Sequence, residues 1–210
     1  MQISIIGAGN MAGGIATRAL AGGHRVRLTD RDAAKAKALA EDLRGRVPGA
    51  DVEPGAADEA DIVVLALPFA AAEEVAAANR DELAGKIVVD ISNPVDFGTF
   101  DSLVVPPGTS AAEQIAAAAP GARVVKAFNT TFAGNLVAGE AGGLPLDVFI
   151  AGDDAEAKQA VADLAASGGL RPVDAGPLRR ARELEGFQFL HMTLQQGLGT
   201  NWSSAIKILS

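Results

Sequence analysis

A turn of small residues near the start of the sequence is the stretch best suited to bind a ligand. It consists of Gly7, Ala8, Gly9, Asn10, Met11 and Ala12. A glycine at position 7 permits a sharp bend, and the missing side chain of Gly9 lets a pyrophosphate approach the backbone. The free N–H groups and the dipole of a helix that begins here attract phosphate. The turn therefore predicts a dinucleotide site; the alternative is a glycine-rich turn that only packs.

Charged residues lie where the ribose of such a nucleotide is expected. Thr29, Asp30 and Arg31 follow the next predicted strand, and Lys35 lies one helical turn later. An acid about twenty residues beyond the glycine turn accepts hydrogen bonds from a ribose 2′-hydroxyl. Arg31 and Lys35 suit a 2′-phosphate, which Asp30 repels, so that Asp30 favours NAD. Two cations against one anion predict NADP, with NAD left open.

Side chains that exchange protons are scarce near this turn. The chain has two histidines, no cysteine and no tyrosine, which excludes disulfides and thiolate metal sites and leaves no metal site expected. His24 lies far from the expected ligand face, and His191 falls on an apolar helix stripe, where a core or interface role is expected. Lys126 ends a buried strand and is expected to pair with a carboxylate or a helix dipole. Asn93 and Asn129 also follow strands, but their amides do not titrate.

We therefore assign no catalytic residue. A site with amides and no acid–base group suits hydride transfer between two cofactors. The redox chemistry then belongs to the cofactors, and the protein supplies their alignment.

The apolar pattern supplies the frame that positions these residues. Short apolar runs predict strands over 2–6, 25–28, 62–67, 86–91, 123–126, 146–151, 170–174 and 205–209. Helical spacing predicts helices over 13–20, 32–44, 70–83, 111–119, 157–164 and 178–198, with loops over 45–57 and 95–110. Pro172 favours a sheet edge for its strand.

The alternation predicts an α/β fold: a doubly wound parallel sheet (Rossmann) with a small C-terminal helical extension. Residues 1–151 are the predicted dinucleotide-binding domain, and residues 152–210 are the helix-rich extension. Ligands of such sheets sit beyond the carboxyl ends of the strands. Five segments that follow strands are expected to share that face: residues 7–12, residues 29–31, Leu67-Pro68-Phe69, Ser92-Asn93-Pro94 and residues 128–131.

Composition narrows the class of protein. The 210 residues carry a net charge of −8, which argues against a nucleic-acid surface. The first apolar run lacks a basic leader, and no run approaches the ~18 apolar residues of a membrane span. A cytoplasmic protein is expected. Helix 178–198 carries an apolar stripe that must bury against something, with a partner subunit as a candidate: Leu184, Phe187, His191, Leu194 and Leu198, widened by Leu190 and Met192.

Several motifs together resemble the NADP-dependent reductases of coenzyme F420, along nearly the whole chain. They are Gly7-Ala8-Gly9-Asn10-Met11, Leu67-Pro68-Phe69, Gly85-Lys86-Ile87-Val88-Val89-Asp90 with Asn93-Pro94, Ala122-Arg123-Val124-Val125-Lys126-Ala127-Phe128-Asn129-Thr130, and Gly176-Pro177-Leu178 before the long helix. The stretch from Lys126 to Asn129 is fairly specific, whereas the glycine turn is shared with many dehydrogenases.

The resemblance implies a site for two cofactors, NADP and the 8-hydroxy-5-deazaflavin coenzyme F420. NADP would lie over residues 7–12 and 29–31. The deazaflavin would stack on the nicotinamide near Asn93-Pro94 and near Ala127, Phe128, Asn129, Thr130 and Thr131. A hydride would pass between nicotinamide C4 and deazaflavin C5. The family also implies a homodimer whose C-terminal helices pack together.

The sequence departs from the family in two places. Asp30 stands where the family usually has serine or threonine, and Ala8 replaces a common threonine in the turn. Other readings also stay open. One is a flavin, ferric or imine reductase of the same fold, although an imine reductase needs a proton donor that does not stand out. Another is a redox-sensing nucleotide-binding protein without turnover.

Overall fold

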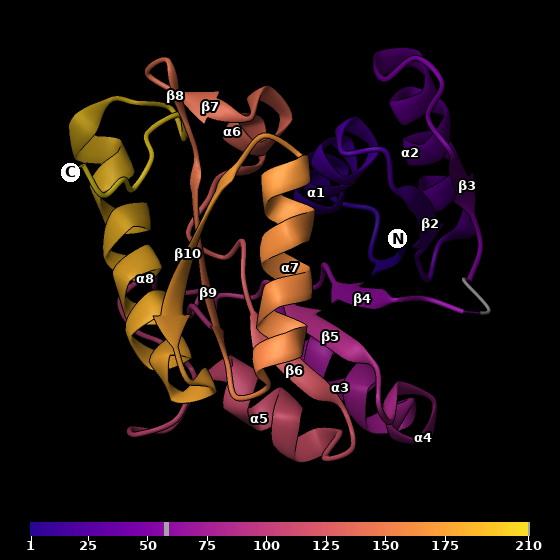
Figure 1. The fold of residues 1–210 in the computed structure, drawn as a ribbon. Coiled ribbons are helices and arrows are strands. Elements are labelled where there is room, and N and C mark those ends of the chain that lie inside the picture. Colours follow the sequence, from indigo (N-terminus) through magenta and orange to yellow (C-terminus); the bar gives the residue numbers. More distant parts are fainter. Residues whose placement is uncertain (57–58, 210) are drawn as a thin grey trace.

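The computed structural model describes residues 1–56 and 59–209 and shows a sheet with helices on both faces (Figure 1). Within the described residues, the main sheet has the strand order β10-β9-β6-β5-β4-β1-β2-β3. Its strands are β1 (Gln2–Ile6), β2 (Arg25–Thr29), β3 (Val52–Pro54), β4 (Ile62–Leu65), β5 (Ile87–Asp90), β6 (Arg123–Lys126), β9 (Asp147–Gly152) and β10 (Arg171–Gly176). The predicted Rossmann-type α/β fold is confirmed.

One part of the sheet is not parallel. Strands β1 to β6 pair in parallel, whereas β9 runs antiparallel to β6 and β10 runs parallel to β9. The chain between β6 and β9 contains helix α6 (Ala133–Ala138) and a hairpin of β7 (Glu140–Ala141) and β8 (Leu144–Pro145). A six-residue helix rises only about 9 Å, too little to return the chain to the opposite edge of the sheet. Strand β9 therefore begins at the edge of the sheet where β6 ends. Strand β10 is an edge strand, as Pro172 predicts.

Helices cover both faces because the strands are apolar on both. Along β4, Ile62 and Val64 join the core under α1 (Asn10–Ala21), α2 (Ala33–Arg46) and α7 (Ala155–Ser167), whereas Val63 and Leu65 join the core under α3 (Phe69–Ala78) and α5 (Ala111–Ala118). This alternation follows from the two-residue period of a strand. Two further helices are α4 (Arg80–Leu83) and α8 (Ala181–Leu198).

Some local predictions were wrong. The loop expected over 45–57 contains β3, which pairs with β2 through Val52 and ends at Pro54; residue 57 lies outside the described residues. The helix expected over 70–83 is divided into α3 and α4 at Asn79. Helix 178–198 begins as a 3₁₀ turn, Leu178–Arg180. Short propensity patterns do not resolve such boundaries, which depend on contacts with distant residues.

The strand expected over 205–209 is absent, because this segment pairs with a side chain and not with a strand. Lys207 Nζ lies 2.6 Å from Asp147 Oδ1, and the Ile208 amide donates to Asp147 Oδ2 over 2.9 Å. Ala205 and Ile206 pack against the cores. The end of the described chain is thus an extended segment held by one buried carboxylate.

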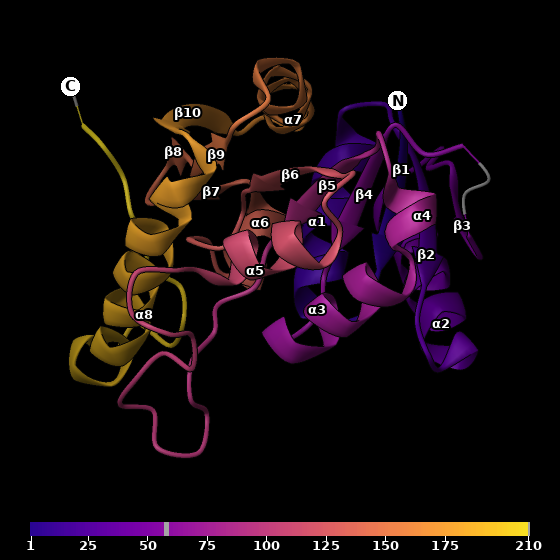
Figure 2. The same cartoon turned by 90° about the horizontal axis from the view of Figure 1, so that it is seen from below.

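Helix α8 turns a largely polar side toward the sheet. Ala181 and Leu184 are buried together with four polar residues: Glu185, Gln188, His191 and Gln195. Phe187, Leu190, Leu194 and Leu198 are instead about half exposed, at 47%, 54%, 46% and 58%. The predicted stripe is therefore divided between a buried and an exposed side. Residues 95–110, the long expected loop, run beside α8 (Figure 2). The rings of Phe100 and Phe189 lie 6.4 Å apart at this contact.

Candidate functional site

The glycine turn leaves β1 and enters α1 as predicted. Gly7 has φ +112°, and an added Cβ would lie 2.3 Å from the Ala66 carbonyl oxygen, so only glycine fits there. Gly9 differs, because an added Cβ would meet no atom within 4 Å. Gly9 precedes α1, and no side chain caps the helix. The amides of the first turn thus remain available to an anion, beside open space at Gly9.

Asp30 braces this turn. Its Oδ2 accepts the Ala8 amide over 2.9 Å, and its Oδ1 accepts the Asp32 amide over 2.9 Å. The hydrogen bond from Asp32, followed by that from Ala8, lowers the pKa of the Asp30 carboxyl, which is therefore ionised at neutral pH. The sequence indicated a ribose contact for this residue; the bond to Ala8 could not be read from spacing.

One cavity, which we call the turn cavity, has a volume of about 520 Å³. It brings together predicted residues from three loops and the start of α2: Gly7, Ala8, Gly9, Asp30, Arg31, Lys35, Leu67 and Pro68. Its further lining comes from Ile6, Ala66 and helix α3, through Ala71, Glu74 and Val75, which sequence reasoning missed. Phe69 does not line it and packs instead against the core under α3 and α5. Thr29 contributes its carbonyl, which accepts the Gly7 amide over 2.7 Å.

A second cavity, the asparagine cavity, has a volume of about 430 Å³. Predicted residues on its wall are Asn10, Met11, Asn93, Asn129 and Thr131. The others are Ile91, Phe132, Ala133, Gly134, Gln188, Met192 and Trp202. Asn10 directly follows Gly9 of the turn cavity, so the two cavities border neighbouring residues of the glycine turn. Gln188, Met192 and Trp202 come from the C-terminal part of the chain, and no local sequence motif predicted that they line this cavity.

The two asparagines that end β5 and β6 hold each other. Asn129 Nδ2 donates to Asn93 Oδ1, and Asn93 Nδ2 donates to the Asn129 carbonyl, each over 3.0 Å. Asn129 Nδ2 also contacts the Leu184 carbonyl of α8 at 3.2 Å. Asn129 Oδ1 is buried and has no hydrogen-bond partner among the described residues. A buried acceptor without a partner costs free energy, which a ligand N–H group that reached it would remove.

The remaining predicted residues lie behind this wall. Ala12, Ala127 and Phe128 belong to the core, and Pro94 and Thr130 are buried. Phe128 has φ +62°, a left-handed conformation uncommon for a bulky residue. Its carbonyl accepts the Thr131 hydroxyl over 2.8 Å. The bend at Phe128 thus separates a buried strand end from the residues that face the cavity.

A buried ion network lies under the asparagines. Lys126 Nζ contacts Asp90 Oδ2 at 2.7 Å, Glu185 Oε1 at 2.8 Å and the Ser92 carbonyl at 2.5 Å. Burial alone would lower the pKa of Lys126, but the carboxylates of Asp90 and Glu185 outweigh burial and raise it. Burial raises the pKa of Glu185, against the pull of Lys126. The network joins β5, β6 and α8. Of the two partners expected for Lys126, a carboxylate and a helix dipole, the structure shows carboxylates.

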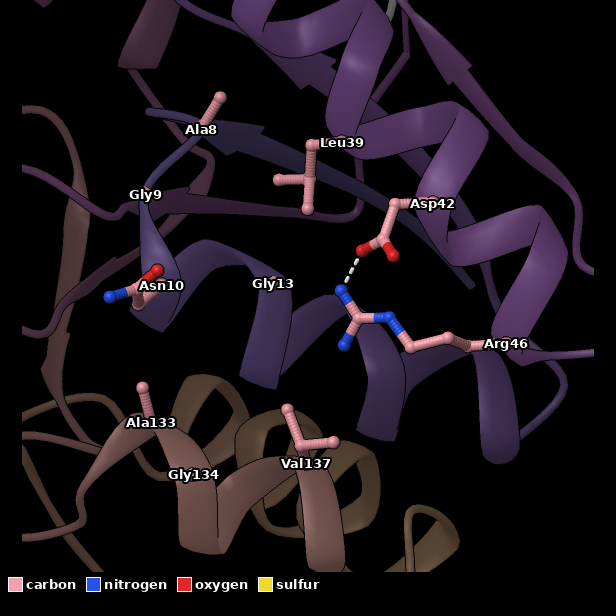
Figure 3. Close-up of a pocket in the computed structure, with 10 residues that line it drawn as sticks. All are labelled: Ala8, Gly9, Asn10, Gly13, Leu39, Asp42, Arg46, Ala133, Gly134 and Val137. Carbon is pink, nitrogen blue, oxygen red and sulfur yellow. Dashed lines mark ion pairs between the residues drawn. The ribbon is translucent and has the colours of Figure 1, made fainter.

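A third cavity, of about 420 Å³, lies between the turn and helices α2 and α6 (Figure 3). Residues 8–10 border it from one side, and Ala133, Gly134 and Val137 of α6 border it from another. Its cation, Arg46, forms an ion pair with Asp42 one turn earlier in α2 (Figure 3). Because these two charges cancel, the side chains of α2 that line the cavity add no net charge to it.

The described residues form neither a metal-binding cluster nor a helix that could span a membrane. Residues 1–56 and 59–209 contain no group of three or more His, Cys, Asp or Glu side chains that could hold a metal ion. In the same part of the chain, each helix is too short or too polar to cross a bilayer.

Comparisons with known proteins find two kinds of relative, one matched along most of its length and one matched over a minor part. A family model described as "NADP oxidoreductase coenzyme F420-dependent" matches residues 2–94. The F420-dependent NADP reductase of Methanocaldococcus jannaschii is 33% identical over 198 residues, which cover 88% of this chain and 88% of that protein. The metalloreductase STEAP3 of Rattus norvegicus is also 33% identical, over 184 residues, but the chain spans only 36% of it.

A solved structure extends this similarity to the fold. A proposed F420-dependent NADP reductase from Arthrobacter sp. FB24 superimposes with a TM-score of 0.83 at 33% identity. The match covers 99% of each chain.

Proposed function

The chain belongs to the coenzyme F420-dependent NADP oxidoreductases, and from that premise we propose that it transfers a hydride between NADP(H) and F420. The observation that carries this is that two cavities border neighbouring residues of one glycine turn. One cavity offers the cations Arg31 and Lys35, and the other offers a locked pair of asparagines. When bound, the nicotinamide and deazaflavin rings supply the hydride chemistry. The chain's own residues bind the rings, align them and exclude water.

The turn cavity fits a phosphorylated dinucleotide. The open space at Gly9 and the uncapped start of α1 suit the pyrophosphate. Arg31 and Lys35 would hold the 2′-phosphate. The Asp30 carboxylate is already satisfied by two backbone amides, which offset part of its charge and weaken its repulsion of the phosphate. This favours NADP over NAD.

The asparagine cavity fits a flat ring with polar edges. Asn129 Oδ1 is an unpaired acceptor, and Asn93 is fixed by Asn129. Met11 and Met192 supply adaptable apolar walls. We assign these residues to orientation and assign no acid or base to the hydride step.

Residues 152–210 contribute a subunit interface in this proposal. Phe187, Leu190, Leu194 and Leu198 recur on one side of α8 and are about half exposed. Fully burying one such side chain contributes roughly 1.5–3 kcal/mol. A second copy of α8 packed on this face would bury all four, which supports a homodimer. A cytoplasmic location suits an enzyme of two dissociable cofactors.

The test is a reaction of purified protein with NADPH and oxidised F420. Loss of the visible absorbance band of the oxidised deazaflavin supports the proposal. The similarity to a metalloreductase makes flavin and ferric chelates the necessary competitors in parallel reactions. Turnover with flavin or ferric chelate but not with F420 would show that the second substrate is that acceptor and not F420. Tight NADP⁺ binding without turnover of any acceptor would favour a nucleotide sensor.

A further inference from the structure

Trp202 occupies an unusual place for the one tryptophan of the chain. It lies beyond the end of α8, yet it lines the asparagine cavity together with Asn93 and Asn129. Its side chain remains 47% exposed. A large, half-exposed aromatic side chain beside polar side chains is a feature of sites that bind flat rings.

The turn that carries Trp202 is held in a strained conformation. Asn201 has φ +49° and Trp202 has φ +63°, so two consecutive residues with side chains are left-handed. Such residues cost energy and persist only where neighbouring contacts impose them, which is common at functional sites. The contacts here are numerous. Asn135 Nδ2 donates to the Ser203 and Ser204 carbonyls over 3.2 and 2.8 Å.

Helix α8 anchors the same turn. His191 Nε2 is hydrogen-bonded to the Ser204 hydroxyl at 2.8 Å, and Gln195 Nε2 donates to that hydroxyl over 2.8 Å. His191 and Gln195 are both buried. Their side chains therefore fix the turn relative to α8, which also supplies Gln188 and Met192 to the cavity.

An aromatic series supports the indole from within. The Phe132 ring meets Trp202 in a T-shaped arrangement at 5.3 Å, and it stacks on His191 at 4.7 Å. Phe132 is nearly buried, so Trp202 rests on a fixed neighbour. The arrangement immobilises the indole before any ligand arrives, which lowers the entropy cost of binding.

We propose that Trp202 is the stacking platform for the second redox ring and that it selects an extended tricyclic ring over a small imine or carbonyl substrate. The inference rests on the proposed function, because it concerns the partner ring of the nicotinamide. An indole gains most from a flat ring of similar or larger size, since stacking grows with the shared area. Small substrates would leave most of the indole uncovered.

The test compares dissociation constants for oxidised F420, riboflavin and NADP⁺, measured by calorimetry on the full chain. Trp202→Ala is expected to raise the Kd for F420 about tenfold, with the Kd for NADP⁺ changed less than about twofold. Trp202→Phe should give an intermediate value. Leu144→Ala, at a comparably exposed position on β8, is the matched control and should bind F420 as the wild type does.

Fluorescence gives a second readout, because the chain has one tryptophan and no tyrosine. Saturating F420 should quench the emission of Trp202, and Trp202→Phe serves as the spectroscopic blank. Unchanged F420 affinity in Trp202→Ala would overturn the platform while the proposed function stands. If Trp202→Ala changes the oligomeric state and leaves the F420 affinity unchanged, Trp202 is an interface residue, and the platform is overturned as well. Failure of the wild type to bind either tricyclic ring, with NADP⁺ still bound, would overturn both proposals.

Discussion

Lys126 of β6 and Glu185 of α8 form an ion pair with 2.8 Å between Nζ and Oε1, and neither side chain is more than 1% exposed. Glu185 also accepts the Ala111 amide over 2.9 Å at the start of α5. One carboxylate thus ties the C-terminal helix both to the end of a central strand and to a neighbouring helix. Ile91 and Asn93, which flank the Ser92 carbonyl that Lys126 contacts, line the asparagine cavity.

Removing the cation from this pair should be costly. Lys126→Met leaves Asp90 and Glu185 buried without their counter-charge, and we expect a loss of about 3–5 kcal/mol in the free energy of unfolding. Urea denaturation measures it. The exposed pair of Arg180 and Glu183 provides a control, since Arg180→Met should cost less than about 1 kcal/mol. If both substitutions lowered the free energy of unfolding equally, burial would not be the reason for the cost at Lys126.

The two glycines of the turn should respond in opposite ways. Gly9→Val places its side chain in open space, so the free energy of unfolding should change little while NADP⁺ binding is lost. Gly7→Ala should instead destabilise the fold, because its Cβ meets the Ala66 carbonyl and φ is +112°. Calorimetric titration and urea denaturation of both variants separate the two effects. Normal NADP⁺ binding by Gly9→Val would show that the nucleotide lies elsewhere.

Asp30 should limit the preference for NADP. Asp30→Ser removes a negative charge near the expected 2′-phosphate, and the ratio of kcat/KM for NADPH over NADH should rise about tenfold. Asp30→Asn is the matched variant, because it removes the charge but keeps an acceptor for the Ala8 amide. A ratio unchanged in both variants would mean that the carboxylate acts only as a brace of the turn.

Acid should release the C-terminal segment. Burial opposes ionisation of Asp147, but the hydrogen bond from Arg171, with those from Ile208 and Lys207, outweighs it and lowers the pKa to about 2. A depressed folded-state pKa stabilises the protein above the unfolded pKa of about 4, and this contribution is lost as pH falls toward 2. Urea denaturation at several pH values should show this decline. Asp147→Asn should be less stable at neutral pH and should decline less over that window.

The exposed side of α8 should control assembly. Leu194→Glu places a charge at the centre of the proposed interface, and we expect a monomer by light scattering. Leu144→Glu, on β8, should leave the wild-type mass unchanged. A monomeric wild type would contradict the proposed dimer.

Much of the fold was readable from local pattern. The strand, glycine turn, helix and following strand over residues 2–29 are adjacent in sequence, and Gly7 meets a steric demand that only glycine satisfies. Continuous apolar runs such as β4 predicted strands covered on both faces, because both of their alternating sides need burial. The alternation of elements then placed the ligand-facing loops at one edge of the sheet.

Other features depend on residues far apart in the chain. The sequence of helix α8 showed an apolar stripe, but contacts with β6 and with the turn after α8 placed its polar residues inside, where Lys126 and Ser204 pair with them. Trp202 reached the cavity for the same reason, through a turn held by Asn135 from a different helix. A buried charge is tolerated where a distant partner meets it, and the distance between such partners is set by packing, which no local pattern records.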